Sequence, residues 1–154
     1  MVEYSDKAKE YFKQGYNCAQ SVVAAYSDKM NIDFETALKL SSSFGGGMGR
    51  LREVCGAVSG MFLVAGMLFG YDSPLDNSAK MNHYALVQKM AAKFKEENGS
   101  IICRELLNNM GKESDNINNL PHTTQLSKKR ACAEMVAQAA EILEEIIKNA
   151  ETKQ

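Results

Sequence analysis

The run from Val54 to Tyr71 constrains the fold most strongly, because it contains no charged residue. A helix that is apolar all round needs either lipid or a surrounding protein core. The run is barely long enough to cross a bilayer, and glycines interrupt it repeatedly. We therefore expect a buried central helix and no membrane association. Its glycines would let another helix or a bound group approach closely.

Glycine, asparagine and serine divide the remaining chain into helical segments, and no strand pattern is evident. The expected helices cover about 3–14, 17–30, 33–40, 54–70 and 77–97, followed by a short helix capped by Ser100 and a long one capped by Ser127. Only the polar stretch from Asn108 to Thr124 has the length of a long loop. We predict an all-α fold, a single domain over 1–154 built as a bundle of about six helices around the buried, glycine-containing helix.

Four cysteines stand far apart in the sequence, namely Cys18, Cys55, Cys103 and Cys132. Residues 1–7 show neither the apolar core nor the cleavage site of an export signal, so we expect a cytoplasmic location. In that reducing compartment cysteines are more often catalytic, redox-sensing or metal-binding than structural. A buried cysteine can also act simply as a small hydrophobe, and Cys132 alone suits that interpretation.

Each cysteine is expected near the start of a helix. Cys18 directly follows Asn17, which is a good N-cap residue. Cys103 and Cys132 follow serine caps, and Cys55 follows a glycine-rich turn. The N-terminal end of a helix favours an anion such as a thiolate. We therefore expect at least one of Cys18, Cys55 and Cys103 to have a thiol pKa below the ordinary value of about 8.5. Cys55 is the expected nucleophile, because the adjoining glycines allow a partner to approach closely.

The four arginines all lie within five residues of a cysteine, at Arg50, Arg52, Arg104 and Arg130. Helical spacing directs Arg104 and Arg130 away from the neighbouring cysteine, whereas Arg52 would share a face with Cys55 if that segment were helical. These side chains either tune thiolates and attract an anionic substrate, or simply cover helix surfaces.

The glycine-rich turn spans 45–49 and lacks the lysine of a phosphate-binding P-loop. Its successive N–H groups can nevertheless form an anion-binding nest. Gly46, Gly47 and Gly56 are therefore candidates to contact a bound group.

The charge pattern excludes some partners. The net charge is −1, and basic and acidic residues are intermixed, which argues against nucleic acid and anionic membranes. The two histidines, His83 and His122, are expected at the surface and not in a mixed cysteine–histidine metal site.

Three short motifs resemble those of a known family. They are Asn17-Cys18-Ala19-Gln20, then Phe44-Gly45-Gly46-Gly47-Met48-Gly49, then Cys55-Gly56-Ala57-Val58-Ser59-Gly60, and single cysteines follow at 103 and 132. Together they resemble the C_GCAxxG_C_C family from about residue 8 to 146. The resemblance implies a small four-cysteine protein with a redox role, often associated with oxidoreductase or transporter genes, and it supplies no substrate. Leu51-Arg52-Glu53 departs from the smaller residues expected before the motif cysteine.

Two functional hypotheses follow. In the first, Cys18, Cys55, Cys103 and Cys132 carry out thiol/disulfide exchange or electron transfer, as in a thiol-dependent oxidoreductase, with a redox partner protein or a small oxidant or reductant. In the second, the same four thiolates bind an iron–sulfur cluster or another metal. A regulatory or assembly role without catalysis is a third hypothesis.

Both of the first two hypotheses require the cysteines to converge. We expect Cys18 and Cys55 to lie close together, with Cys103 or Cys132 completing the site. The sequence is compatible with a homo-oligomer and sets no oligomeric state.

Overall fold

The computed structural model describes residues 3–108 and 122–152, and it describes side chains for 3–108 and 131–152. The described residues are all-α, and their only strand-like feature is an isolated antiparallel bridge between Val54 and Ile102. The helical elements are α1 (Tyr4–Lys13), α2 (Cys18–Ala25), α3 (Ser27–Met30), α4 (Phe34–Ser41), the 3-10 turn η1 (Ser42–Phe44), α5 (Gly45–Met48), α6 (Gly56–Phe69), α7 (Asn77–Asn98), α8 (Cys103–Asn108) and α9 (His122–Thr152).

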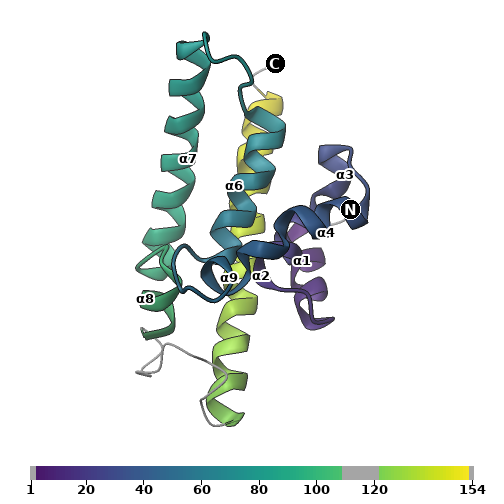
Figure 1. Cartoon of the computed structure of the whole chain (residues 1–154), viewed down its shortest axis with the longest axis vertical. Helices are drawn as coiled ribbons and strands as arrows, with labels where there is room; N and C mark the ends of the chain where they lie inside the picture. Colours follow the sequence, from purple (N-terminus) through teal and green to yellow (C-terminus); the bar gives the residue numbers. More distant parts are fainter. Residues whose placement is uncertain (1–2, 109–121, 153–154) are drawn as a thin grey trace.

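Three helices set the long axis of the molecule. Figure 1 shows α6, α7 and α9 running along this axis, with α1 to α4 grouped on one side. Helix α6 contacts α2, α7 and α9, and α1 packs along α9. The uncharged run is therefore the central helix that the sequence predicts. Its first six residues are all buried, whereas Gly66 and Met67 near its C-terminal end are exposed.

The core forms where α2, α6 and α9 meet. Val22, Met61 and Leu143 are fully buried there. The Tyr26 hydroxyl donates a hydrogen bond of 2.6 Å to the carbonyl oxygen of Ala140, which joins α9 to the end of α2. Burial of side chains of this size stabilises the fold by about 1.5–3 kcal/mol each.

Glycines allow α2 and α6 to cross closely. A Cβ atom at Gly60 would lie 2.9 Å from the Ala19 carbonyl oxygen and 3.2 Å from Val22 Cβ. Only a residue without a side chain fits at that distance. This confirms the expected packing role for Gly60, whereas at Gly66 a Cβ atom would meet nothing within 4 Å, so the expectation is wrong there.

Side-chain caps fix several helix starts as predicted. Asn17 and Gln20 form a capping box at α2, and Asp33 accepts a hydrogen bond from the Thr36 N–H at α4. At α7 the capping residue is Asp76, one position before the expected start.

Other boundaries differ from the predictions. The expected second helix is divided at Tyr26, which leaves helical geometry while its ring stacks on Tyr4, with 4.4 Å between ring centroids. Helix α8 begins at Cys103, and the Ser100 hydroxyl accepts a hydrogen bond from the Ile102 N–H just before it. The described helices therefore outnumber the six expected.

The last helix also begins earlier than predicted. Helix α9 begins at His122, so Ser127 lies inside the helix and does not cap it. Residues 122–124 of the expected long loop are helical, and its residues 109–121 lie outside the described residues. No helix within 3–108 or 122–152 combines the length and apolarity needed to cross a bilayer.

Candidate functional site

All four cysteines line one cavity of about 830 Å³. They come from different elements, because Cys18 begins α2, Cys55 precedes α6, Cys103 begins α8 and Cys132 lies in α9. All four are in the thiol form. Cys55 is only 6% exposed, and the other three are partly exposed. The four cysteines, far apart in the sequence, therefore share one cavity in the structure.

The capping box positions Cys18. The Gln20 N–H donates to Asn17 Oδ1 at 2.8 Å, and the Asn17 N–H donates to Gln20 Oε1 at 3.1 Å. The Asn17 amide also donates to the Ser42 carbonyl oxygen at 3.1 Å, which ties the start of α2 to the segment before the glycine turn. The Cys18 sulfur packs directly on Gly56, in the space that a Cβ atom there would need. A side chain at position 56 would therefore clash with the Cys18 sulfur, which lies on the neighbouring helix α2.

Cys55 is held by the backbone. It is the N-cap residue of α6, and its N–H donates to the Ile101 carbonyl oxygen at 2.7 Å. Burial raises the pKa of the Cys55 thiol well above its usual range, and the nearby Cys18 sulfur acts in the same direction. The N–H groups of Val58 and Ala57 lower the pKa but do not offset the burial. The expectation that its position at a helix start lowers the pKa of Cys55 is therefore wrong.

A short backbone pairing places Cys103 beside the glycine turn. The Cys103 N–H donates to the Glu53 carbonyl oxygen at 2.6 Å, and the Arg104 N–H donates to the Arg52 carbonyl oxygen at 3.2 Å. A Cβ atom at Gly47 would lie 2.6 Å from Cys103 Cβ, so the glycine makes room for this cysteine. The pairing brings together segments that are about fifty residues apart in the chain.

Arg52 contacts Cys103 and is the functional side chain that sequence reasoning misplaced. It lies in a left-handed backbone conformation with φ +62°, outside any helix, and is only 7% exposed. Its Nη1 donates to Cys103 Sγ at 3.7 Å, whereas the helical spacing had directed it toward Cys55. Arg104 instead donates to the Leu51 carbonyl oxygen at 3.2 Å, which confirms that it is directed away from the adjacent cysteine.

The Cys103 thiol also departs from the low pKa expected at a helix start. Burial raises its pKa, and this outweighs the hydrogen bond and positive charge of Arg52, which lower it. A negative charge on Cys18 raises the pKa further. Cys18 therefore interacts electrostatically with both Cys55 and Cys103.

Cys132 lies in the interior of α9. Because the helix begins at His122, the cysteine is well beyond the first turn, where the positive end of the helix dipole acts. The prediction that a serine cap and the dipole act on Cys132 is therefore wrong. The residue nevertheless lines the cavity, beside Ala133 and Met135.

The glycines proposed to contact a bound group have different positions. Gly46 and Gly56 line the cavity, and Gly47 is buried against Cys103. Gly46 and Gly47 both have left-handed backbone conformations, with φ +69° and +73°. These two glycines interrupt the helical geometry of α5. Arg50 and Arg52, which follow them in the chain, both line the cavity.

The four cysteines are a possible set of metal ligands. Four thiolates are the right ligands in kind for an iron–sulfur cluster or zinc. Within the described part of the chain, however, no three cysteine, histidine or acidic side chains are close enough to hold one metal ion. In this arrangement the residues do not fit the group.

The histidines do not complete such a site. His83 lies in α7, half-buried beside Tyr71, and lines a second cavity instead of the cysteine cavity. We expected His83 at the surface, and in the structure its side chain is only partly exposed. The side chain of His122 lies outside the described residues.

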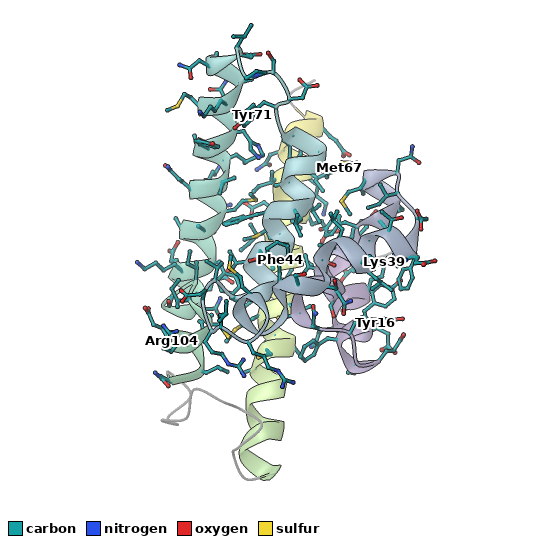
Figure 2. The ribbon with its side chains drawn as sticks, in the orientation of Figure 1. Tyr16, Lys39, Phe44, Met67, Tyr71 and Arg104 are labelled. Atoms are coloured by element: carbon teal, nitrogen blue, oxygen red, sulfur yellow. The ribbon has the colours of Figure 1, made fainter. Side chains whose placement is uncertain are left out.

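Apolar side chains also line the cavity, and no pattern in the sequence indicated that they would. We call this set the apolar wall, and it consists of Phe12, Tyr16, Leu106, Leu107 and Met135. Figure 2 shows Tyr16 toward the end of the molecule where Arg104 lies, away from Tyr71. The cavity thus has thiols, cationic side chains and apolar side chains on its walls.

The comparisons with known proteins agree with this geometry. The family model described as "Putative redox-active protein (C_GCAxxG_C_C)" matches residues 16–146, which include all four cysteines and the glycine turn. Neither the search of curated proteins nor that of solved structures found a match. The family match covers most of the chain, and this chain therefore belongs to the C_GCAxxG_C_C family.

Proposed function

We propose that this protein is a dithiol–disulfide oxidoreductase that exchanges electrons at the cavity lined by its cysteines. The observation that carries the proposal is the convergence of Cys18, Cys55, Cys103 and Cys132 on that one cavity, from four separate elements. Thiols that are this far apart in sequence need a specific fold to bring them together. Packing alone would not require all four at the same surface.

Cys18 is proposed as the attacking thiol. It is partly exposed, lies in the first turn of α2 and interacts electrostatically with two other cysteines. Cys55 is proposed as the resolving thiol. It directly precedes Gly56, on which the Cys18 sulfur packs, and its burial keeps it protonated until a partner sulfur approaches.

The proposed reaction is a thiol–disulfide exchange in two steps. The Cys18 thiolate attacks one sulfur of a substrate disulfide, breaks the substrate S–S bond and forms a mixed disulfide, and the leaving thiolate takes up a proton. Cys55 then attacks the Cys18 sulfur and breaks its bond to the remaining substrate sulfur, and the proton of Cys55 passes to that sulfur, so that the second substrate thiol is released. Two electrons pass from the protein dithiol to the substrate disulfide, and the protein is left with a Cys18–Cys55 disulfide. The reverse reaction would oxidise a dithiol partner.

A cytoplasmic location suits this function, because a reducing compartment keeps such thiols ready for exchange. Either a small disulfide or a partner protein can serve as substrate in this reaction.

The test uses the reduced protein and 2-hydroxyethyl disulfide, followed by peptide mapping with mass spectrometry. We expect a Cys18–Cys55 disulfide in the unmodified chain. The Cys55→Ser variant should accumulate a mixed disulfide on Cys18, because nothing resolves it. The Cys132→Ser variant is the matched control and should still form the Cys18–Cys55 disulfide.

Two results would contradict the proposal. One is the absence of any intramolecular disulfide under conditions that oxidise a model dithiol. The other is recovery of stoichiometric iron or zinc from anaerobically purified protein, with all four thiols protected from alkylation.

A further inference from the structure

Cationic side chains gather at the cysteine cavity, although the chain as a whole is nearly neutral, with 18 basic and 19 acidic residues. Lys13, Arg50 and Arg52 line the cavity, and no aspartate or glutamate is among its described lining residues. The described lining is therefore richer in cations than the chain as a whole.

The backbone around the arginines adopts costly conformations. Arg50 and Arg52 have φ values of +67° and +62°, in the left-handed region that side chains other than glycine rarely adopt. Each such residue costs on the order of 1–2 kcal/mol. The turn keeps two long cations in these conformations where both line the cavity.

One of these cations is already at a thiol. Arg52 Nη1 lies 3.7 Å from Cys103 Sγ, and Cys18 and Cys55 line the same cavity. An anion bound near Arg50 and Arg52 would therefore occupy the same cavity as the reacting sulfurs of Cys18 and Cys55. A cavity of about 830 Å³ has the volume of a small-molecule site, which lies in the range of roughly 300–1,000 Å³.

From these features we infer that the substrate is a small anionic disulfide, with a carboxylate or similar group close to its sulfur–sulfur bond. The inference rests on the dithiol function proposed above and names its substrate class. Lys13, Arg50 and Arg52 bind the anionic group, the apolar wall receives the carbon chain, and the S–S bond is presented to Cys18. The electron and proton balance is that of the exchange reaction above, with two anionic thiols as products.

The experiment compares three small disulfides of similar size and different charge: dithiodiacetate, which is a dianion, neutral 2-hydroxyethyl disulfide and dicationic cystamine. Rate constants for oxidation of the reduced protein are divided by those for N-acetylcysteine amide, an uncharged model thiol, to remove intrinsic reactivity. We expect the corrected rate for the dianion to exceed that for the neutral disulfide by about tenfold at low salt. The preference should shrink in 0.5 M salt.

Two double variants distinguish the charge of the cavity lining from the net charge of the whole protein. Lys13 and Arg50 are exposed, so the double variant Lys13→Gln/Arg50→Gln should fold, and it should lose most of the preference. The matched control Lys39→Gln/Lys95→Gln removes two exposed cations that do not line the cavity and should keep it.

Each contrary outcome has a distinct meaning. Equal corrected rates for all three disulfides would overturn the anionic substrate and leave the dithiol function intact. Equal loss of preference in both double variants would assign the effect to overall charge and overturn the cavity site. Failure of every disulfide to oxidise the protein would overturn the proposed function itself.

Discussion

At the scale of single residues, sequence signals from neighbouring residues correctly predicted that Cys18 begins a helix, but they did not predict the contact that Arg52 makes. The Asn17 cap and Gln20 three residues later are a short-range signal, and the capping box forms as expected. Arg52 contacts a cysteine 51 residues away, through a left-handed backbone that no helical spacing describes. Burial was the second missing factor, since it raises the pKa of Cys55 and Cys103 where helix position alone predicted a decrease.

The Arg52–Cys103 contact gives a prediction at this scale. Replacing Arg52 with Met removes a hydrogen bond and a positive charge that lower the pKa of Cys103, so that pKa should rise further. Peptide-resolved alkylation with iodoacetamide over a pH series measures the change. Arg52→Lys should restore part of the charge effect and move the alkylation midpoint back.

Arg104→Met is the control for this prediction. Arg104 affects Cys103 only through its charge, and it is the last of the causes that act on this thiol. Its removal should move the midpoint less than the loss of Arg52. An equal shift in both variants would show that the contact between Nη1 and Sγ has no specific effect.

At the scale of elements, the sequence predicted helices better than their ends. The uncharged run became α6 and the caps at Asn17 and Asp33 began α2 and α4, because these features depend on neighbouring residues. The break at Tyr26 depends on a buried ring and on α9, which lies more than a hundred residues away. The isolated bridge at Val54 depends in the same way on a distant segment.

Two glycines of α6 provide a prediction with an internal control. Gly60→Ala should lower the free energy of unfolding by about 1–3 kcal/mol, because the new Cβ atom would meet the Ala19 carbonyl oxygen at 2.9 Å. Gly66→Ala meets nothing within 4 Å and should raise it by about 0.5–1 kcal/mol, through the better helix propensity of alanine. Urea denaturation of both variants measures the difference. Effects of the same sign would show that α2 and α6 do not cross as closely as described.

At the scale of the whole molecule, the composition of the cavity is the feature that could be predicted least well from the sequence. Convergence of the cysteines was expected from the family resemblance and from the need for a shared site. Arginines that attract an anionic substrate near the cysteines were also one of the expectations. The apolar wall was not expected, because it combines Tyr16 with residues from α1, α8 and α9. Such a combination depends on how the helices pack, which spacing along the chain does not specify.

Buried thiols should make the stability of the molecule depend on pH. The pKa of Cys55 and that of Cys103 are raised in the folded state. Below the unfolded value of about 8.5 both states are protonated, and the stabilisation is fully present. Above that pH the unfolded chain loses its protons first, so the free energy of unfolding falls by up to about 1.4 kcal/mol per pH unit for each thiol until the folded pKa is passed.

Denaturation of the reduced protein between pH 7.5 and 10.5 tests this dependence. Lysines and tyrosines also titrate in this range, so the informative quantity is the difference in slope between the unmodified chain and Cys55→Ser. The variant should have the shallower slope. Identical slopes would mean that Cys55 ionises in the folded protein as it does in water.

The bridge between Val54 and Ile102 has a consequence for how this family can vary. The amides of Cys55 and Cys103 donate to the carbonyl oxygens of Ile101 and Glu53, so main-chain groups hold the two cysteine segments together. Main-chain groups are the same in every amino acid except proline, which has no N–H to donate. Relatives can therefore diverge at positions 53 and 101 without moving either thiol. In this part of the site, what must be kept is therefore a backbone shape and not the identity of the side chains at 53 and 101.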